Sequence, residues 1–464
     1  MKKLASNKFI LNIQTFLLYI LPVVIFFSYH PVITVGEDST MNLEFSVTLI
    51  WLLIFSIISL PSIYKFLRYN CKKEKWPILL SLLFPLYSSV AIIWSENFLR
   101  AVLTSGVIWC LWLSVISIIS FFKTQQENEN LKRNLLKIFF FSTTLVCLFC
   151  WVQCIFDITG IPRENSLLCA GCTIQSFGFP HPNGFAIEPQ FMGNLLLAPV
   201  FLASYLFLNT SQGRKKIYFF LLTLLFSSTL FLTMSRGAIY AFVIGLIILL
   251  IIKNKNQKTL KSLVIIPIVV FSFLFTLVFQ GICAEISPTN DTFLSGTSKV
   301  LSQMSLGIID IPYELESEKS SDDAETITPQ FDGYVEVSTT TRLGLSELAF
   351  KTWTSSPTIF IFGAGTGSAG KAMHAFSPES LAEKEIVQNE YLEIALELGL
   401  IGIIILFLDL AFLIKIALKK EHEITVIPIL ASFLVSYLFF SGLPNSIHIF
   451  LLPTLLIAST KKSN

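Results

Sequence analysis

Charged side chains are scarce in this sequence. Asp, Glu, Lys and Arg make up 14% of the 464 residues, whereas hydrophobic residues make up 53% and the mean hydropathy is +0.70. An ordinary soluble domain carries roughly 25% charged residues. The composition therefore excludes a soluble globular fold and predicts an all-α membrane protein that crosses the bilayer many times. The 43 phenylalanines suit helices that face lipid.

Cysteine and histidine are also few, with eight and five residues. Four cysteines fall in apolar stretches, where cysteine packs as a small hydrophobic residue: Cys110, Cys147, Cys150 and Cys154. Cys169 and Cys172 form the pattern CAGC in an external loop, which suits a disulfide in an oxidising compartment. A zinc site at CAGC would need two more ligands at a standard spacing, and the sequence has none. We expect neither a metal nor a cofactor.

Apolar runs near the roughly 20 residues that a membrane span needs recur along the chain. About twelve are expected, at 9–28, 43–67, 77–94, 101–122, 136–157, 191–208, 217–233, 238–252, 262–280, 393–414, 424–440 and 446–460. The first is long and lacks a small-residue cleavage site, so it is expected to be a retained helix and not a secretory signal.

Basic residues concentrate in alternate loops between these runs. With the N-terminus in the cytoplasm, most of the 33 Lys and Arg residues fall on the cytoplasmic side, as the positive-inside rule requires. This orientation places both termini in the cytoplasm and the loops 158–190 and 281–392 outside. The whole chain, 1–464, is expected to form one polytopic domain.

The loop 281–392 is the one large external loop that the sequence predicts. Its middle is acidic and polar, which predicts a segment surrounded by solvent. Apolar residues at helical spacing predict a short helix over 339–353, and the sequence SSP should end it. The following run, 365–370, matches the pattern G-x-G-x-x-G. The loop has no room for the parallel sheet that a dinucleotide site needs, so we interpret this run as a turn.

Arginines near the external ends of spans are candidate ligands for an anion. Arg236 lies between two apolar runs in TMSRGA, and Arg342 opens the helix expected in the large loop. Arg163 in the first external loop is a third candidate. The planar guanidinium suits phosphate oxygens, and two such groups could hold a diphosphate. The alternative for Arg236 is a side chain that reaches the membrane interface without binding anything.

Two further polar stretches fall at the external ends of spans. In PHPNGFAIEPQF, His181, Asn183 and Glu188 either line a polar site or form a rigid loop that ends at a helix start. In QNEYLEIALELG, a polar wall is expected from Gln388, Asn389, Glu393 and Glu397. Asn389, Glu393 and Glu397 are four residues apart and share a helical face. The alternative is an ordinary helix start with acids near its positive end.

Taken together and in order, these stretches resemble the O-antigen ligase and polymerase superfamily of membrane glycosyltransferases. The resemblance covers roughly 90–450, with its core at 191–450, and rests on AIIWSENFLRAV (91–102), FPHPNGFA (179–186), EPQFMGNLLL (188–197), LFLTMSRGA (230–238), TRLGLSELAFKTWTSSPTIFIFGAGTGS (341–368) and QNEYLEIALELGLIGIII (388–405). The single large external loop also fits this family.

The resemblance implies a function at the outer face of the bacterial inner membrane. Such proteins transfer a glycan from undecaprenyl diphosphate to an acceptor, either a lipid A-core or another carrier-linked glycan, without metal or nucleotide. Arginines hold the diphosphate, a role that the motifs give to Arg236 and Arg342. The expected partners are therefore the carrier-linked donor, the acceptor and membrane lipid, and no nucleic acid.

One position departs from the ligase pattern. Ligases have a His before the Asn of the last motif, and this chain has Gln388. A neutral amide cannot act as a general base near pH 7. Catalysis then depends on another group, for which His374, His181 and Glu188 are candidates, or on positioning and electrostatics, as in a polymerase. The sequence leaves polymerase and ligase unresolved, and a transporter or flippase of lipid-linked glycans or a non-catalytic scaffold are the alternatives.

Overall fold

The computed structural model describes most of the chain. The described residues are 2–29, 31–35, 43–70, 78, 80–124, 129–158, 173–176, 179–211, 213–257, 260–286, 292–305, 309, 337–378, 386–417, 423–441 and 447–459. Arg163, Cys169, Cys172 and the acidic middle of the large loop lie outside them.

The fold is a bundle of helices, as the hydropathy predicts. Each of the twelve expected spans contains a helix: α1 (Lys2–Val24), α2 (Val47–Lys65), α4 (Leu83–Val90), α5 (Phe98–Thr124), α6 (Glu129–Ile158), α7 (Pro189–Asn209), α8 (Arg214–Leu232), α9 (Arg236–Gln257), α10 (Ile265–Ile286), α15 (Glu390–Ala417), α16 (Glu423–Ser436) and α17 (His448–Ser459). Eight stretches of the described chain are long and apolar enough to cross a membrane, in α2, α5–α10 and α15. The helices α1, α4, α16 and α17 are shorter in their apolar parts.

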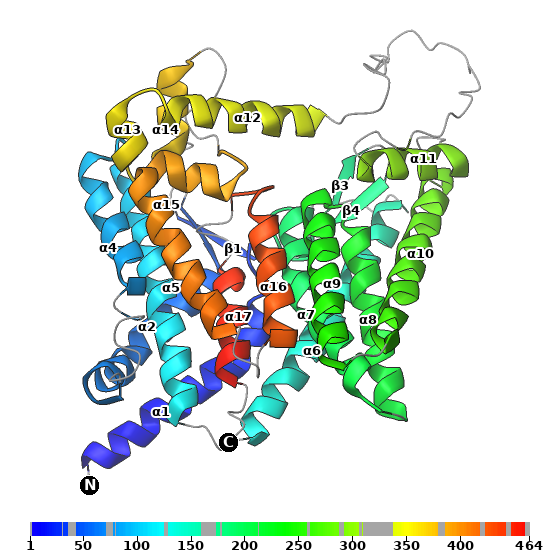
Figure 1. The fold of residues 1–464 in the computed structure, drawn as a ribbon, viewed down its shortest axis with the longest axis horizontal. Helices are drawn as coiled ribbons and strands as arrows, with labels where there is room; N and C mark the ends of the chain where they lie inside the picture. Colours follow the sequence, from blue (N-terminus) through cyan, green and yellow to red (C-terminus); the bar gives the residue numbers. More distant parts are fainter. Residues whose placement is uncertain are drawn as a thin grey trace.

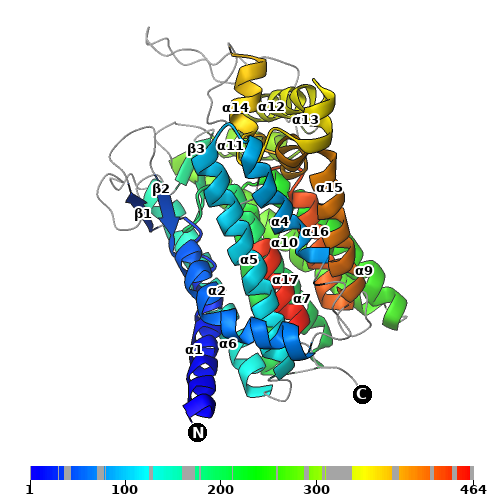
Figure 2. The ribbon, with the colours of Figure 1, turned by 90° about the vertical axis from the view of Figure 1, so that its left-hand side faces the viewer.

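The bundle carries its loop helices at one end (Figure 1). These helices are α11 (Phe293–Met304), α12 (Val337–Trp353), α13 (Pro357–Phe362) and α14 (Ala369–Phe376). We call this the loop end of the molecule. The helix α1 begins at the opposite end, as Figures 1 and 2 both show. The expected helix at 339–353 is thus confirmed as α12.

Two small antiparallel hairpins interrupt the helical pattern. Strands β1 (Val32–Val35) and β2 (Leu43–Ser46) form one, and β3 (Thr173–Ser176) and β4 (Phe179–Pro182) form the other. Neither was expected from the sequence. Each has only two short strands, so the fold class remains all-α.

The helix α7 lies at the centre of the bundle. In its most apolar window 83% of the residues are buried inside the protein, against 33–56% in the other spans. The remaining faces of those spans carry exposed Leu, Ile, Val and Phe side chains, which is the surface that lipid covers. The residues at the first turn of α7, Gln190 among them, are likewise buried inside the protein.

The glycine-rich turn after α13 joins the loop helices to the bundle. Gly363, Gly365 and Gly367 all have positive φ angles, which only glycine adopts without strain. A Cβ on Gly365 would stand 2.6 Å from the Cα of Ser95. The hydroxyl of Ser95 in turn donates to the carbonyl of Thr366 at 2.9 Å. The interpretation of this run as a close-packed turn fits these contacts.

The same turn contacts α15 where that helix is interrupted. Gly399 has a φ of 65° and breaks the helical backbone. The break leaves the carbonyls of Leu396 and Glu397 without donors inside the helix. The glycine-rich segment supplies these donors: Ala364 N donates to Leu396 O at 2.8 Å and Gly365 N to Glu397 O at 2.9 Å. The segments WSEN (94–97), GAGTGS (363–368) and LELG (396–399) therefore contact one another, and these contacts join the loop helices to the bundle.

Substitution of Gly365 by Ala should weaken the contacts of this turn with Ser95 and α15. The methyl group would overlap the Ser95 backbone, and the φ of 101° is strained for alanine, so we expect a loss of about 2 kcal/mol or more. The measurement is thermal unfolding of the purified protein in one lipid nanodisc preparation. The matched control is Gly344→Ala on α12, where the space is open and alanine favours the helix. Equal unfolding temperatures for G365A and wild type would contradict the role of this turn.

Candidate functional site

Three successive backbone carbonyls after α16 form the centre of the candidate site. The carbonyl of Tyr437 accepts from the backbone N–H of Glu390 at 3.0 Å, and that of Leu438 from the side chain of Asn389 at 3.2 Å. The carbonyl of Phe439 accepts from Gln190 at 2.9 Å. Because the chain has left α16 at Ser436, these three carbonyls have no helical partner and bind donors from other elements.

The amino ends of α7, α9 and α15 meet at these carbonyls. Gln190 lies in the first turn of α7, and Glu390 is the first residue of α15. Gly237 is the second residue of α9, and a Cβ there would stand 2.7 Å from Cβ of Phe439 and 2.8 Å from Nε2 of Gln190. Each helix amino end carries a partial positive charge and unpaired N–H groups, which favours an anion nearby.

Arg342 reaches this centre from the loop helix α12. Its guanidinium donates to the side-chain oxygen of Gln190 at 2.5 Å and to the carbonyl of Phe439 at 3.3 Å. A cation at the carboxyl end of α16 is also favoured by the helix dipole. One end of α12 is thus fixed to two membrane helices that are distant in sequence.

Arg236 lies at the first position of α9, next to Gly237. Met234, two residues before Arg236, has a positive φ of 53°, so the chain turns sharply between α8 and α9. A Cβ on Gly193 of α7 would stand 2.7 Å from Ala238 and 3.1 Å from Thr233. The small residues of TMSRGA therefore let α7 and α9 approach closely, and this approach places Arg236 beside the segment 437–439.

His181 on β4 lies within range of the Arg236 charge. Its side chain is 5% exposed, and its Nε2 has no hydrogen-bond partner in the described chain. Burial, and secondly the positive charge of Arg236, lower the pKa of His181 from 6.5 to about 4. At neutral pH this imidazole is uncharged and is a weak base.

Asn183 and Glu188 occupy the turn between β4 and α7. Asn183 is buried and donates to the carbonyl of Ala186 at 2.9 Å, which closes the turn. Gln153 of α6 holds the next residue, Gly184, by bonds to its N–H at 3.0 Å and its carbonyl at 3.2 Å. These contacts favour the rigid-loop interpretation for Asn183. Glu188 is half-buried at the position before α7, and its side chain makes no capping bond there.

The segment before α15 is strained at Gln388. Its φ is 61°, and together with Met234 it is one of two non-glycine residues with positive φ in the described chain. Both lie in sequence motifs at this centre, and such strain is often found at functional sites. Asn389 caps α15 by accepting from Leu392 N at 3.2 Å. This cap supports the helix-start interpretation, while the amide of Asn389 also bonds the segment 437–439.

The two carboxylates of the expected polar wall are buried below this cap. Glu393 is 6% exposed and Glu397 is 8% exposed. Glu397 accepts from Ala369 N at 3.3 Å, and one oxygen of Glu393 has no partner in the described chain. The charge of Arg100 acts on both carboxylates. Arg100 lies in the motif AIIWSENFLRAV but was not singled out from the sequence, and its charge acts on this pair of carboxylates.

The structure brings only some of the sequence candidates together. Arg342 and Asn389 contact residues 437–439, and Arg236 precedes Gly237, which packs on Phe439. His181 lies within range of the Arg236 charge. His374 is half-buried on α14, which packs against α12 and α15. Arg163 lies outside the described residues. Gln190 and the segment 437–439 were missed, because a buried glutamine and a run of backbone carbonyls have no distinctive pattern in the sequence.

The low pKa of His181 predicts a stability that depends on pH. The unfolded chain binds the proton near pH 6.5 and the folded chain near 4, so folding stability is complete above about pH 6.5 and falls as the pH drops toward 4. The loss reaches about 3 kcal/mol at most. Thermal unfolding at pH 7.5 and 4.5 measures it, with His181→Gln as the control. The same acid loss in wild type and H181Q would contradict the assignment.

Comparison with known families gives one match. A family model described as O-antigen ligase matches residues 220–407. The matched region runs from α8 to α15 and includes Arg236, Arg342 and the segment at Gln388. None of the curated proteins matches the chain significantly. The match over residues 220–407, the motifs and their order, and the helical membrane fold support a relation of the chain to the O-antigen ligase and polymerase superfamily.

Proposed function

We propose that this protein transfers or polymerises a glycan carried on undecaprenyl diphosphate, with the diphosphate held by Arg236 and Arg342. An acceptor hydroxyl attacks the anomeric carbon of the donor sugar. The new C–O bond forms as the bond to the diphosphate oxygen breaks, and the diphosphate leaves with that electron pair. The hydroxyl proton passes to a base. Arginine side chains lower the barrier because charge develops on the leaving diphosphate.

The observation that carries this proposal is the position of Arg342. A guanidinium from the external loop is bound to Gln190 and Phe439 at the point where three helix amino ends meet. Arg236 begins one of those helices. Positive charge from two arginines and three helix ends suits a diphosphate better than a neutral ligand. The surrounding O-antigen ligase match supports the same substrate class.

Three residues remain proposed as the base, since Gln388 cannot fill that role. His181 lies within range of the Arg236 charge, but its pKa of about 4 makes it a poor proton acceptor at pH 7. Glu188 stands two residues before Gln190 and makes no capping bond. His374 is carried on α14. Of the three, Glu188 combines nearness to Gln190 with an ionisable oxygen, and we favour it.

The site lies at the loop end of the molecule, which we propose faces the exterior of the inner membrane. The loops 158–190 and 281–392 would then be external and both chain ends cytoplasmic. The acceptor, a lipid A-core or a second carrier-linked glycan, would approach from the side of the loop helices. We propose that the reaction uses neither a metal nor a nucleotide, with the two arginines balancing the charge of the leaving diphosphate.

Substitution of either arginine should remove transfer. We expect Arg342→Ala and Arg236→Ala to lower the rate with purified donor and acceptor by roughly 100-fold or more, as when one transition-state donor is lost. Arg342→Lys should recover only part of the rate, because lysine offers a point charge in place of a planar fork. Arg133→Ala is the matched control, since Arg133 is exposed on α6 and its side chain donates to Asn130 one turn earlier. Full activity in R342A would overturn the proposal.

The same reconstituted system distinguishes a transferase from a transporter and from a scaffold. Movement of a labelled carrier lipid across the membrane without a new glycosidic bond would identify a transporter. Neither movement nor bond formation would identify a scaffold. In cells, loss of the gene that leaves a single repeat on the lipid anchor identifies a polymerase, and loss of all glycan from the anchor identifies a ligase.

A further inference from the structure

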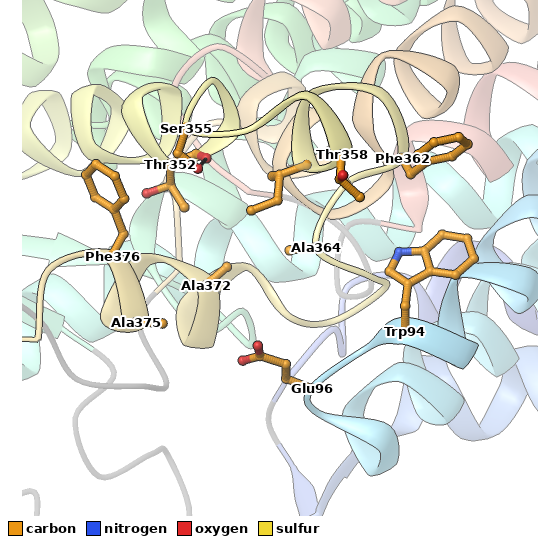
Figure 3. Close-up of a pocket in the computed structure, with 12 residues that line it drawn as sticks. Trp94, Glu96, Thr352, Ser355, Thr358, Phe362, Ala364, Ala372, Ala375 and Phe376 are labelled. Atoms are coloured by element: carbon orange, nitrogen blue, oxygen red, sulfur yellow. Dashed lines mark hydrogen bonds between the residues drawn. The ribbon is translucent and has the colours of Figure 1, made fainter.

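A cavity of about 690 Å³ lies among the loop helices. None of its lining residues belongs to the arginine site, by which we mean Arg236, Arg342 and residues 437–439. The cavity is lined by residues of α12, α13 and α14 and by Trp94 and Glu96 of the bundle. Its size falls within the roughly 300–1,000 Å³ of pockets that hold small molecules. Figure 3 shows Trp94 and Phe362 at one end and Phe376 at the other.

The walls of this cavity are mostly apolar, with a few polar groups. Small and aromatic side chains make up the apolar part, among them Ala364, Ala372, Ala375, Phe362 and Phe376. The polar part comes from Glu96, Thr352, Ser355 and Thr358. The Thr352 and Ser355 hydroxyls already bond backbone carbonyls of α12, at 2.8 Å and 2.7 Å. These two can still accept a hydrogen bond, because a hydroxyl has two lone pairs.

One carboxylate in the cavity wall has no hydrogen-bond partner in the described chain. Glu96 is held through its backbone, whose carbonyl accepts from Lys371 at 3.2 Å. Its exposed side chain points toward the cavity in Figure 3. The indole nitrogen of Trp94 is enclosed by neighbouring atoms, so Trp94 offers the cavity an aromatic surface and no donor.

We propose that this cavity is a saccharide subsite that holds a sugar ring of the glycan substrate. This inference rests on the proposed glycosyl transfer. A pyranose has C–H faces that pack against Trp94, Phe362 and Phe376, and hydroxyls that can donate to the Glu96 carboxylate and to the hydroxyl oxygens of Thr352 and Ser355. A hydrocarbon chain would satisfy none of these polar groups.

The helix α12 sets the distance between this subsite and the arginine site. Arg342 lies near its start and Thr352 near its end, ten residues on, which corresponds to about 15 Å along a helix. That length suits a short oligosaccharide between the reacting sugar and a ring in the cavity. Because Arg342 and the cavity wall share one rigid helix, binding at one site helps to orient the other.

The test uses the full-length protein in lipid nanodiscs, which avoids detergents with sugar head groups. The probe is the free oligosaccharide repeat released from the host's own surface polysaccharide, with binding followed by saturation-transfer NMR. Ala375→Trp should fill the cavity and lower the affinity tenfold or more. Trp94→Phe removes part of the aromatic wall and should lower it about three- to tenfold. Leu343→Trp, an exposed change on α12 outside the cavity, should leave binding unchanged.

Transfer kinetics of the same variants identify which glycan occupies the cavity. A raised KM for the acceptor alone assigns the subsite to the acceptor, and a raised KM for the donor alone assigns it to the donor. Unchanged oligosaccharide binding in both A375W and W94F, or displacement by a short polyprenol and not by sugar, would overturn the subsite. Arg342→Ala should lose transfer and still bind the oligosaccharide, so failure of the proposed reaction and failure of the subsite give different results.

Discussion

The backbone carbonyls at residues 437–439 are the interaction on which the loop end depends. They follow the last residue of α16, Ser436, where the chain has left the helix and these carbonyls are open to donors from other elements. In this protein they bind the amino end of α15, the first turn of α7 and the guanidinium of Arg342 on α12. Three elements far apart in the sequence are thereby fixed at one point, and the two arginines that we assign to the diphosphate lie beside it.

The close packing around that point follows from small residues. Gly237 and Gly193 let α7, α9 and the end of α16 approach more closely than any side chain with a Cβ would permit. The glycine-rich turn does the same between α13, α15 and Ser95. The G-x-G-x-x-G pattern is thus explained by packing in this chain. Two glycine-dependent contacts, one at the arginines and one at the turn, position the loop helices on the bundle.

Much of the fold could be predicted from the sequence, because a bilayer imposes a simple rule on composition. All twelve expected segments contain helices, and the apolar spacing at 339–353 gave α12. The break of α15 at Gly399 could not be predicted, since a glycine in a long apolar run usually leaves a helix intact. The break depends on donors from a turn more than thirty residues earlier, which no local pattern reveals.

The candidate site was predicted only in part, for a similar reason. Charged residues next to apolar runs are conspicuous, so Arg236 and Arg342 could be singled out. Gln190, Arg100 and the carbonyls of 437–439 could not, because their roles come from contacts between positions far apart in the sequence, such as Arg342 with Gln190, 152 residues apart. Asn183 was conspicuous as well, yet its hydrogen bonds are those of a turn.

The most direct test is a cryo-EM structure of the protein in lipid nanodiscs with undecaprenyl diphosphate bound. The account predicts that the diphosphate contacts the guanidinium groups of Arg342 and Arg236 while Gln190 still donates to the carbonyl of Phe439. A diphosphate bound away from both arginines, or α12 detached from residues 437–439, would contradict it.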